Sequence, residues 1–166
     1  MITPAAAAQI QKGATTPSMG VLASLLGFRM RRVHAHLTRS FAERLADKAL
    51  RPGGFSALAL IAANPGLSQQ ALSLELGQDQ ATVVALLDEL EARGWAERRR
   101  AVTDRRRHRL LVTEAGAVAL AEMAATASSN ERQVVAALSP EEAEVLMRLL
   151  DKLYHACFSP DAQAEA

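Results

Sequence analysis

Two short helical segments separated by a glycine turn constrain the fold of this chain more than any other feature. Ser68 can cap the first segment, residues 69–76, by accepting a hydrogen bond from the free backbone donors of its first turn. Gly77 can end that helix because glycine enters the left-handed conformation without a steric penalty. Asp79 is placed to cap a second helix that continues to residue 92. Two short helices joined by a tight turn predict a helix-turn-helix.

The second helix, residues 79–92, has one apolar face and one open face. Its apolar face, which we expect to hold it to the core, consists of Val83, Leu86, Leu87 and Leu90. Its open face offers Gln80, Ala81, Thr82 and Ala85. A glutamine amide can bond adenine and small methyl groups can contact thymine in the major groove, which is just wide enough for one α-helix. We therefore expect this helix to read DNA bases.

Arginines are concentrated directly after this helix. Residues 93–109 hold eight arginines against Glu97 and Asp104, a local net charge of +6 in a chain whose net charge is +1. The rest of the chain therefore carries a net charge of −5. Cationic charge gathered into a tenth of a chain is typical of a protein that binds a polyanion.

The arginine-rich segment has the alternation of a two-stranded ribbon. We expect strands from Trp95 to Ala101 and from Arg107 to Val112, joined by a polar loop around Asp104. Arginines at the tip of such a wing can contact phosphates or enter a narrow minor groove, while the carboxylate of Asp104 would orient one of them. The predicted DNA contacts are Ser68, Gln69, Gln80, Ala81, Thr82, Ala85, Arg98, Arg100, Arg105, Arg106 and Arg107.

Long helices flank this central region, 53–113. Apolar residues recur at steps of three or four from Val21 to about Leu50, and an alanine-rich helix is expected from Thr113 towards Ala137. A final helix begins with the capping box at 139–142. The blocks 19–50 and 114–158 have wide apolar faces without a third layer to cover them, which favours a homodimer. Residues 1–18 and 159–166 are predicted to be a loose arm and a flexible tail. The expected fold class is mainly α with a small two-stranded β wing.

Several motifs resemble the signature of MarR-type (multiple antibiotic resistance regulator) transcriptional regulators. The similar residues are the stretch from Leu86 to Gly94, then Arg98, then Asp104-Arg105-Arg106, and then the stretch from Leu110 to Gly116. The resemblance covers about residues 20–157. It implies a winged helix-turn-helix homodimer that binds double-stranded DNA, with the terminal helices at the dimer interface, and often a repressor that phenolic or aromatic ligands release.

The chain departs from this pattern along the open face of the second helix. Ala81, Val84 and Ala85 stand where relatives commonly carry serine, threonine and arginine. Trp95-Ala96 replaces the usual valine or isoleucine before the wing. Hydrogen-bond readout of bases is therefore expected to be sparse, with more reliance on methyl contacts and DNA shape.

A cationic stripe on the first long helix leaves two interpretations open. Helical spacing places Arg32 beside His36, with His34 near the apolar stripe. In one interpretation, these residues are surface arginines and partly buried histidines. Alternatively, they bind a small aromatic acid or its thioester in a cleft walled by Phe28 and Phe55. A regulator without any small-molecule effector is a further alternative.

Other classes of function lack the necessary residues. Cys157 is the only cysteine, so we expect a buried apolar filler at the interface, with a thiol-based redox sensor as the alternative. His34 and His36 point about 200° apart on a helix, so no metal site is expected. The sequence contains neither a phosphate loop nor a nucleophile elbow, so we do not expect an enzyme. No cofactor is expected either. The absence of a long apolar run or signal peptide favours a cytoplasmic protein without a membrane partner.

Overall fold

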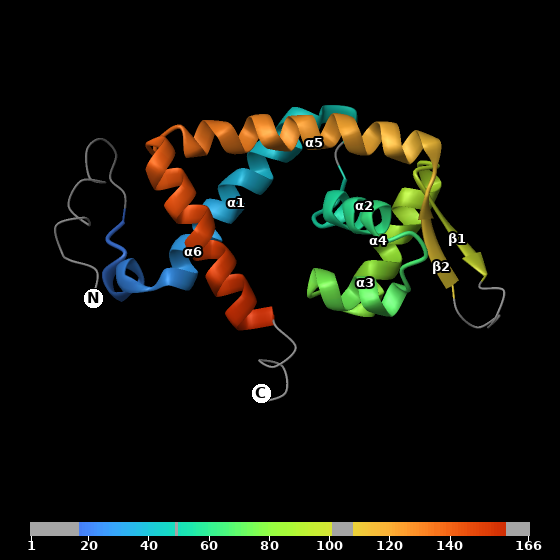
Figure 1. The fold of residues 1–166 in the computed structure, drawn as a ribbon, viewed down its shortest axis with the longest axis horizontal. Helices are drawn as coiled ribbons and strands as arrows, with labels where there is room; N and C mark the ends of the chain where they lie inside the picture. The colour runs from blue at the N-terminus through green and yellow to red at the C-terminus, as the bar shows by residue number, and fades with distance from the viewer. Residues whose placement is uncertain (1–16, 49, 101–107, 159–166) are drawn as a thin grey trace. The chain divides into compact units, whose positions relative to one another are not determined.

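The computed structural model describes residues 17–48, 50–100 and 108–158 (Figure 1). These residues form helices and one two-stranded antiparallel sheet, which confirms the predicted fold class. Contacts divide the chain into two compact units, residues 1–121 and 122–166. None of the helices in the described ranges combines the length and apolar character needed to cross a membrane.

The first long helix is shorter than the apolar periodicity predicts. A 3₁₀ helix, η2 (Gly20–Ser24), precedes α1 (Leu26–Leu45), and a second 3₁₀ turn, η3 (Ala46–Lys48), follows it. The chain is extended at Leu25, with φ −90° and ψ 118°. The prediction of one continuous helix from Val21 to about Leu50 was therefore wrong. A 3₁₀ helix has three residues per turn, so apolar side chains recur at compatible spacing after the α-helix has ended.

Three short helices, α2 (Gly54–Ala63), α3 (Gln69–Leu76) and α4 (Gln80–Ala92), pack together around the core of the first unit (Figure 1). The bounds of α3 and α4 confirm the two helices expected from the caps and the glycine turn. The largest fully buried side chains in these helices are Leu58, Ile61, Leu72, Val83, Leu86, Leu87 and Leu90. The four residues predicted as the apolar face of the second helix are all among them, which confirms that face.

The sheet pairs β1 (Ala96–Arg100) with β2 (His108–Val112) in the predicted antiparallel arrangement. The register runs from Ala96 opposite Val112 to Arg100 opposite His108. A bridge that the sequence did not reveal joins Leu67 to Leu110, with the Leu110 N–H donating to the Leu67 carbonyl at 3.0 Å. Leu110 is fully buried, so the inner strand of the wing is fixed to the core rather than extending freely from it.

α5 (Glu114–Val135) begins against the chain that enters the wing. The Thr113 hydroxyl accepts from the Gly116 N–H at 3.0 Å, which confirms Thr113 as the cap, and donates to the Gly94 carbonyl at 2.6 Å. The Thr113 N–H donates to the Trp95 carbonyl at 3.1 Å. A Cβ atom on Gly116 would lie only 1.9 Å from that carbonyl oxygen, so this position requires glycine.

The second unit contains the end of α5 and α6 (Pro140–Phe158). The predicted capping box is present: the Ser139 hydroxyl accepts from the Glu142 N–H at 3.2 Å, and the Glu142 carboxylate accepts from the Ser139 N–H at 2.9 Å. One side of α6 is apolar yet exposed, and its residues follow one another at steps of three or four: Leu146, Leu149, Leu153 and Cys157. The opposite stripe is polar and carries Glu144, Arg148, Asp151 and His155.

Candidate nucleic-acid interface

The turn between α3 and α4 is rigidly hydrogen-bonded. The Ser68 hydroxyl accepts from the Ala71 N–H at 3.1 Å and so caps α3, as predicted. Gly77 ends α3 in the left-handed region, with φ 60° and ψ 33°. The Ser73 hydroxyl then donates to the Gln78 carbonyl, and the Gln78 N–H donates back to the Ser73 carbonyl at 3.1 Å. These bonds fix the direction in which α4 leaves the turn.

Asp79 caps α4 with both carboxylate oxygens. One oxygen accepts from the Thr82 N–H at 2.9 Å, and the other accepts from the Thr82 hydroxyl at 2.6 Å. These hydrogen bonds, the hydroxyl bond first, lower the pKa of Asp79 below its ordinary value, because they stabilise the ionised form. The hydroxyl proton of Thr82 is therefore committed to Asp79, which leaves its methyl group and a lone pair for a base.

The predicted base-reading residues lie on the accessible side of α4. Gln80 and Ala81 are exposed, and Thr82 and Ala85 are half-buried. Val84 is also exposed on this helix, although its apolar character did not mark it as a candidate. The accessible surface is thus rich in methyl groups, with the Gln80 amide as its long polar side chain.

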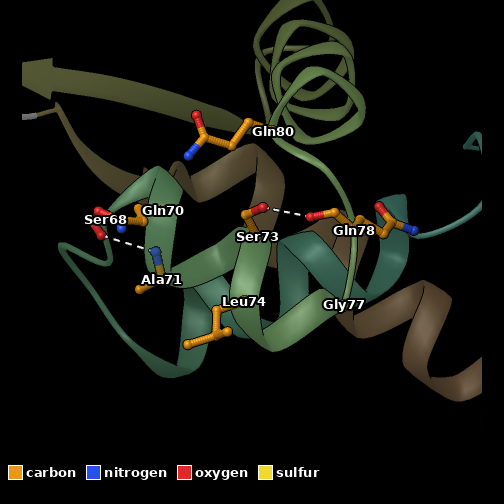
Figure 2. Close-up of a pocket in the computed structure, with 8 residues that line it drawn as sticks. All are labelled: Ser68, Gln70, Ala71, Ser73, Leu74, Gly77, Gln78 and Gln80. Carbon is orange, nitrogen blue, oxygen red and sulfur yellow. Dashed lines mark hydrogen bonds between the residues drawn. The ribbon is translucent and has the colours of Figure 1, made fainter. Parts of the chain in front are cut away.

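A pocket of about 640 Å³ opens between the start of α3 and the start of α4 (Figure 2). Its lining residues are Ser68, Gln70, Ala71, Ser73, Leu74, Gly77, Gln78 and Gln80. Figure 2 shows the Gln80 amide above the end of α3 that carries Ser68 and Gln70. Gln70 is exposed, whereas the predicted contact Gln69 is half-buried. Sequence reasoning missed Gln70, although the four-residue spacing from Gln70 to exposed Leu74 marks the outward face of α3.

Ion pairs within the first unit neutralise part of the arginine cluster. Glu89 of α4 pairs with Arg51 at 3.0 Å and with Arg93 at 3.2 Å. Arg99 pairs with Glu97 on its own strand. The +6 charge predicted for residues 93–109 therefore overstates the free cationic charge, because that window leaves out the carboxylates of α4.

The side chain of Arg98 lies against α4 and is largely shielded from solvent. Its guanidinium pairs with Asp88 at 2.7 Å and with Glu91 at 2.5 Å, and only 18% of its side chain is exposed. The sequence predicts Arg98 as a DNA contact, whereas the structure places its guanidinium against two α4 carboxylates that are seven and ten residues away in the sequence. Arg100 is the last residue of β1. The predicted contacts Arg105, Arg106 and Arg107 lie outside the described residues.

Arg109 is an exposed cation that the predicted site left out. It lies on β2 opposite Arg99, and its side chain passes Gly66 at 3.6 Å from the position a Cβ would take. Alternation along the strand could have identified it, since its neighbour Leu110 points into the core.

The structure does not bring the predicted effector residues together within one chain. Arg32, His34 and His36 are all exposed on α1. Phe55 packs edge-on against Phe41, with ring centroids 5.3 Å apart. Phe28 is half-buried, and it precedes Phe41 by thirteen helical residues, or roughly 20 Å along the axis at 1.5 Å per residue. The two phenylalanines therefore cannot line one small cleft in a single subunit.

The remaining candidates for chemistry are isolated side chains. We expected Cys157 to be a buried apolar filler at the interface, but it is exposed in the single chain. Within the described ranges, no three His, Cys, Asp or Glu side chains gather in a way that could hold a metal ion.

Comparisons with known proteins agree with this geometry. A model of the MarR family matches residues 52–107. Over 136 residues, the chain is 36% identical to the "Putative transcriptional regulatory protein for hcr operon" of Thauera aromatica, with 81% of this chain and 82% of that protein covered.

Two solved structures of the transcriptional repressor CouR are also similar. CouR bound to a 23-mer DNA duplex is 32% identical with a TM-score of 0.75, covering 84% of this chain and 99% of that chain. CouR bound to p-coumaroyl-CoA is 30% identical with a TM-score of 0.72, covering 83% and 97%. The α3–turn–α4 unit, the two-stranded wing and these similarities together show that the chain belongs to the MarR family of winged helix-turn-helix, DNA-binding transcriptional regulators.

Proposed function

We propose that this regulator is a repressor that binds an inverted-repeat operator as a homodimer and is released by a small aromatic effector. The observation that carries the proposal is the capped helix α4, whose Gln80 and Ala81 are exposed while its apolar face is fully buried. Similarity to CouR, a repressor solved on a DNA duplex, supports the same mode of action. In this mode α4 lies in the major groove and the wing contacts the flanking backbone.

The proposed dimer interface is formed by the terminal helices. Leu22, Leu26, Met30 and Val33 continue the apolar stripe of η2 and α1, and each is at least 40% exposed in the single chain. α6 adds large exposed apolar residues, among them Leu149 and Leu153. Apolar surface of this extent usually marks an interface between proteins. A two-fold dimer would place its two α4 helices about one DNA turn apart, roughly 34 Å.

The proposed effector is an aromatic acid or its coenzyme A thioester. CouR bound to p-coumaroyl-CoA supports an effector of this class. Arg32 and the neighbouring His36 are both exposed on α1 and supply N–H donors that a carboxylate or phosphate could contact. An effector releases DNA only if it binds the conformation that does not bind DNA more tightly than the one that does.

The wing is tested by Arg106→Ala. This change should weaken binding to every duplex alike and lower the salt slope by about one unit per subunit. The reason is that DNA binding releases fewer counterions when one phosphate contact per subunit is missing. A loss concentrated at A·T-rich flanks would instead place Arg106 in the minor groove. Salt titrations by fluorescence anisotropy, on a duplex from upstream of the protein's own gene and on a scrambled duplex, measure both effects.

Gln80→Ala provides the contrast for that experiment. It should change the preference between operator and scrambled duplex while leaving the salt slope unchanged, since a base contact carries little of the charge-dependent affinity. If Arg106→Ala in a folded dimer retains parental affinity and salt slope, the wing tip does not contact DNA.

The effector site is tested by replacing Arg32 and His36 together with alanine. The double variant should bind operator DNA as the parent does, but should need at least tenfold more p-coumaroyl-CoA for release, because an anionic ligand loses its partners. Titrating the preformed complex with p-coumaroyl-CoA and with the free acid gives both values. Parental release by both compounds would show that the effector binds elsewhere.

A further inference from the structure

We propose that Arg98 is a positioning residue that locks wing strand β1 onto the recognition helix α4, and that it does not contact DNA. The proposal rests on DNA binding by this region and concerns how the two DNA-reading elements are held in register. Arg98 is the third residue of β1, and its side chain reaches across to three successive points on α4.

Both the guanidinium and the backbone N–H of Arg98 contact α4. Nη1 donates to Asp88 Oδ1 at 2.7 Å and to Glu91 Oε2 at 2.5 Å, and Nη2 donates to the Val84 carbonyl at 3.2 Å. The backbone N–H of Arg98 donates to the other oxygen of Glu91 at 2.7 Å. The Glu91 carboxylate therefore binds Arg98 twice: one oxygen accepts from the Arg98 backbone N–H, and the other accepts from the Arg98 guanidinium.

The span of these contacts determines what they can fix. Val84 and Glu91 are seven residues apart, so the anchors cover about two turns of α4, roughly 10 Å. A single ion pair would leave β1 free to pivot, whereas anchors along two turns set its direction as well as its position. Charge-assisted hydrogen bonds of this kind are stronger than neutral ones. Solvent screens the pair with Glu91, which is 33% exposed, less than the pair with Asp88, which is 60% exposed.

The rest of the wing follows from this anchoring. Arg98 is paired in register with Leu110, which is buried and bridged to Leu67. The strand pair is thus fixed on one side to α4 and on the other to the segment before α3. The cluster of Arg98, Asp88 and Glu91 carries a net charge of −1 at neutral pH, which is unsuited to a phosphate contact.

Glu91→Gln gives the sharpest test because electrostatics and positioning predict opposite signs. Removing a carboxylate near DNA should tighten binding if charge alone matters. If Glu91 holds the wing in place, the variant should bind the operator duplex about tenfold more weakly or worse. Arg98→Ala should weaken binding similarly without reducing the salt slope, and the double variant should be little worse than either single one because both remove one interaction.

Arg98→Lys and Arg99→Ala complete the set. Lysine keeps the charge but cannot present a planar fork to three acceptors, so it should be as defective as Arg98→Ala. Arg99 lies next along the same strand with 66% of its side chain exposed, and Arg99→Ala removes the same charge without touching the anchoring contacts. Arg99→Ala should therefore show the same iodide quenching of Trp95 fluorescence as the parent.

A readout without DNA separates this proposal from the proposed repressor function. Trp95 is the only tryptophan, and it directly precedes β1. Loosening the wing should increase iodide quenching of its fluorescence in Arg98→Ala and Glu91→Gln, at unchanged helical circular dichroism. Parental quenching in both variants, tighter DNA binding by Glu91→Gln, or a salt slope lowered by about one unit per subunit in Arg98→Ala would each overturn the proposal. Absence of salt-dependent operator binding by the parent would overturn the repressor function instead.

Discussion

Leu149→Glu should convert the protein into a monomer that binds operator DNA at least a hundredfold more weakly. Leu149 is 51% exposed in the single chain and lies in the middle of the apolar side of α6. In the proposed dimer, a carboxylate at this place would be buried without a cationic partner, which is strongly unfavourable. Losing one of two linked DNA-binding units removes an avidity that commonly amounts to between about 10² and 10⁴.

Analytical ultracentrifugation at micromolar concentration measures the change in oligomeric state, and anisotropy titration measures the DNA affinity. Arg148→Gln is the matched control, because it makes the same change of one unit in net charge on the polar stripe of α6. That variant should stay dimeric. If Leu149→Glu also sediments as a dimer with parental DNA affinity, the α6 face does not form the interface.

Gly116→Ala should lower the free energy of unfolding by about 3 kcal/mol, at the upper end of what overpacking costs. The added Cβ would meet the Trp95 carbonyl oxygen at 1.9 Å, and a backbone atom cannot swing aside as the end of a side chain can. The Trp95 carbonyl is also the acceptor for Thr113 N–H, so relief of the clash would disturb the junction between the wing and α5.

Urea unfolding followed by circular dichroism, at one fixed protein concentration, measures this loss. Gly27→Ala makes the identical chemical change near the start of α1, where a Cβ would meet nothing within 4 Å of this chain. That control should alter stability by less than about 1 kcal/mol. Equal stability of Gly116→Ala and the parent would mean that the start of α5 can shift without cost.

The acidic residues of α4 link the recognition helix to its surroundings. Glu89 joins it to Arg51, just before α2, and Glu91 joins it to β1 through Arg98. Carboxylates on α4 that read as a solvated helix face in the sequence thus pair with cations on neighbouring segments. The orientation of α4 is set by these ion pairs on one side and by its buried apolar face on the other.

Local chemistry explains what the sequence alone was able to predict. The caps at Ser68, Asp79 and Ser139 act within three residues, so each is legible without knowledge of the fold. The apolar spacing of α4 likewise identified its buried face, since a helix has a fixed period. Alternation within each strand predicted the two-stranded wing, and the family resemblance agrees with it.

Contacts between segments distant in sequence were decided only by the tertiary structure. Arg98 reads as one more cation in a basic run, and its pairing with Asp88 depends on how β1 folds back along α4. Phe28 and Phe55 read as two walls of one cleft, but Phe55 packs on Phe41, far along α1. Gly116 reads as an ordinary helical glycine until the Trp95 carbonyl is placed against it. Periodicity and capping describe a residue's own element, whereas charge pairing and steric fit depend on which elements meet.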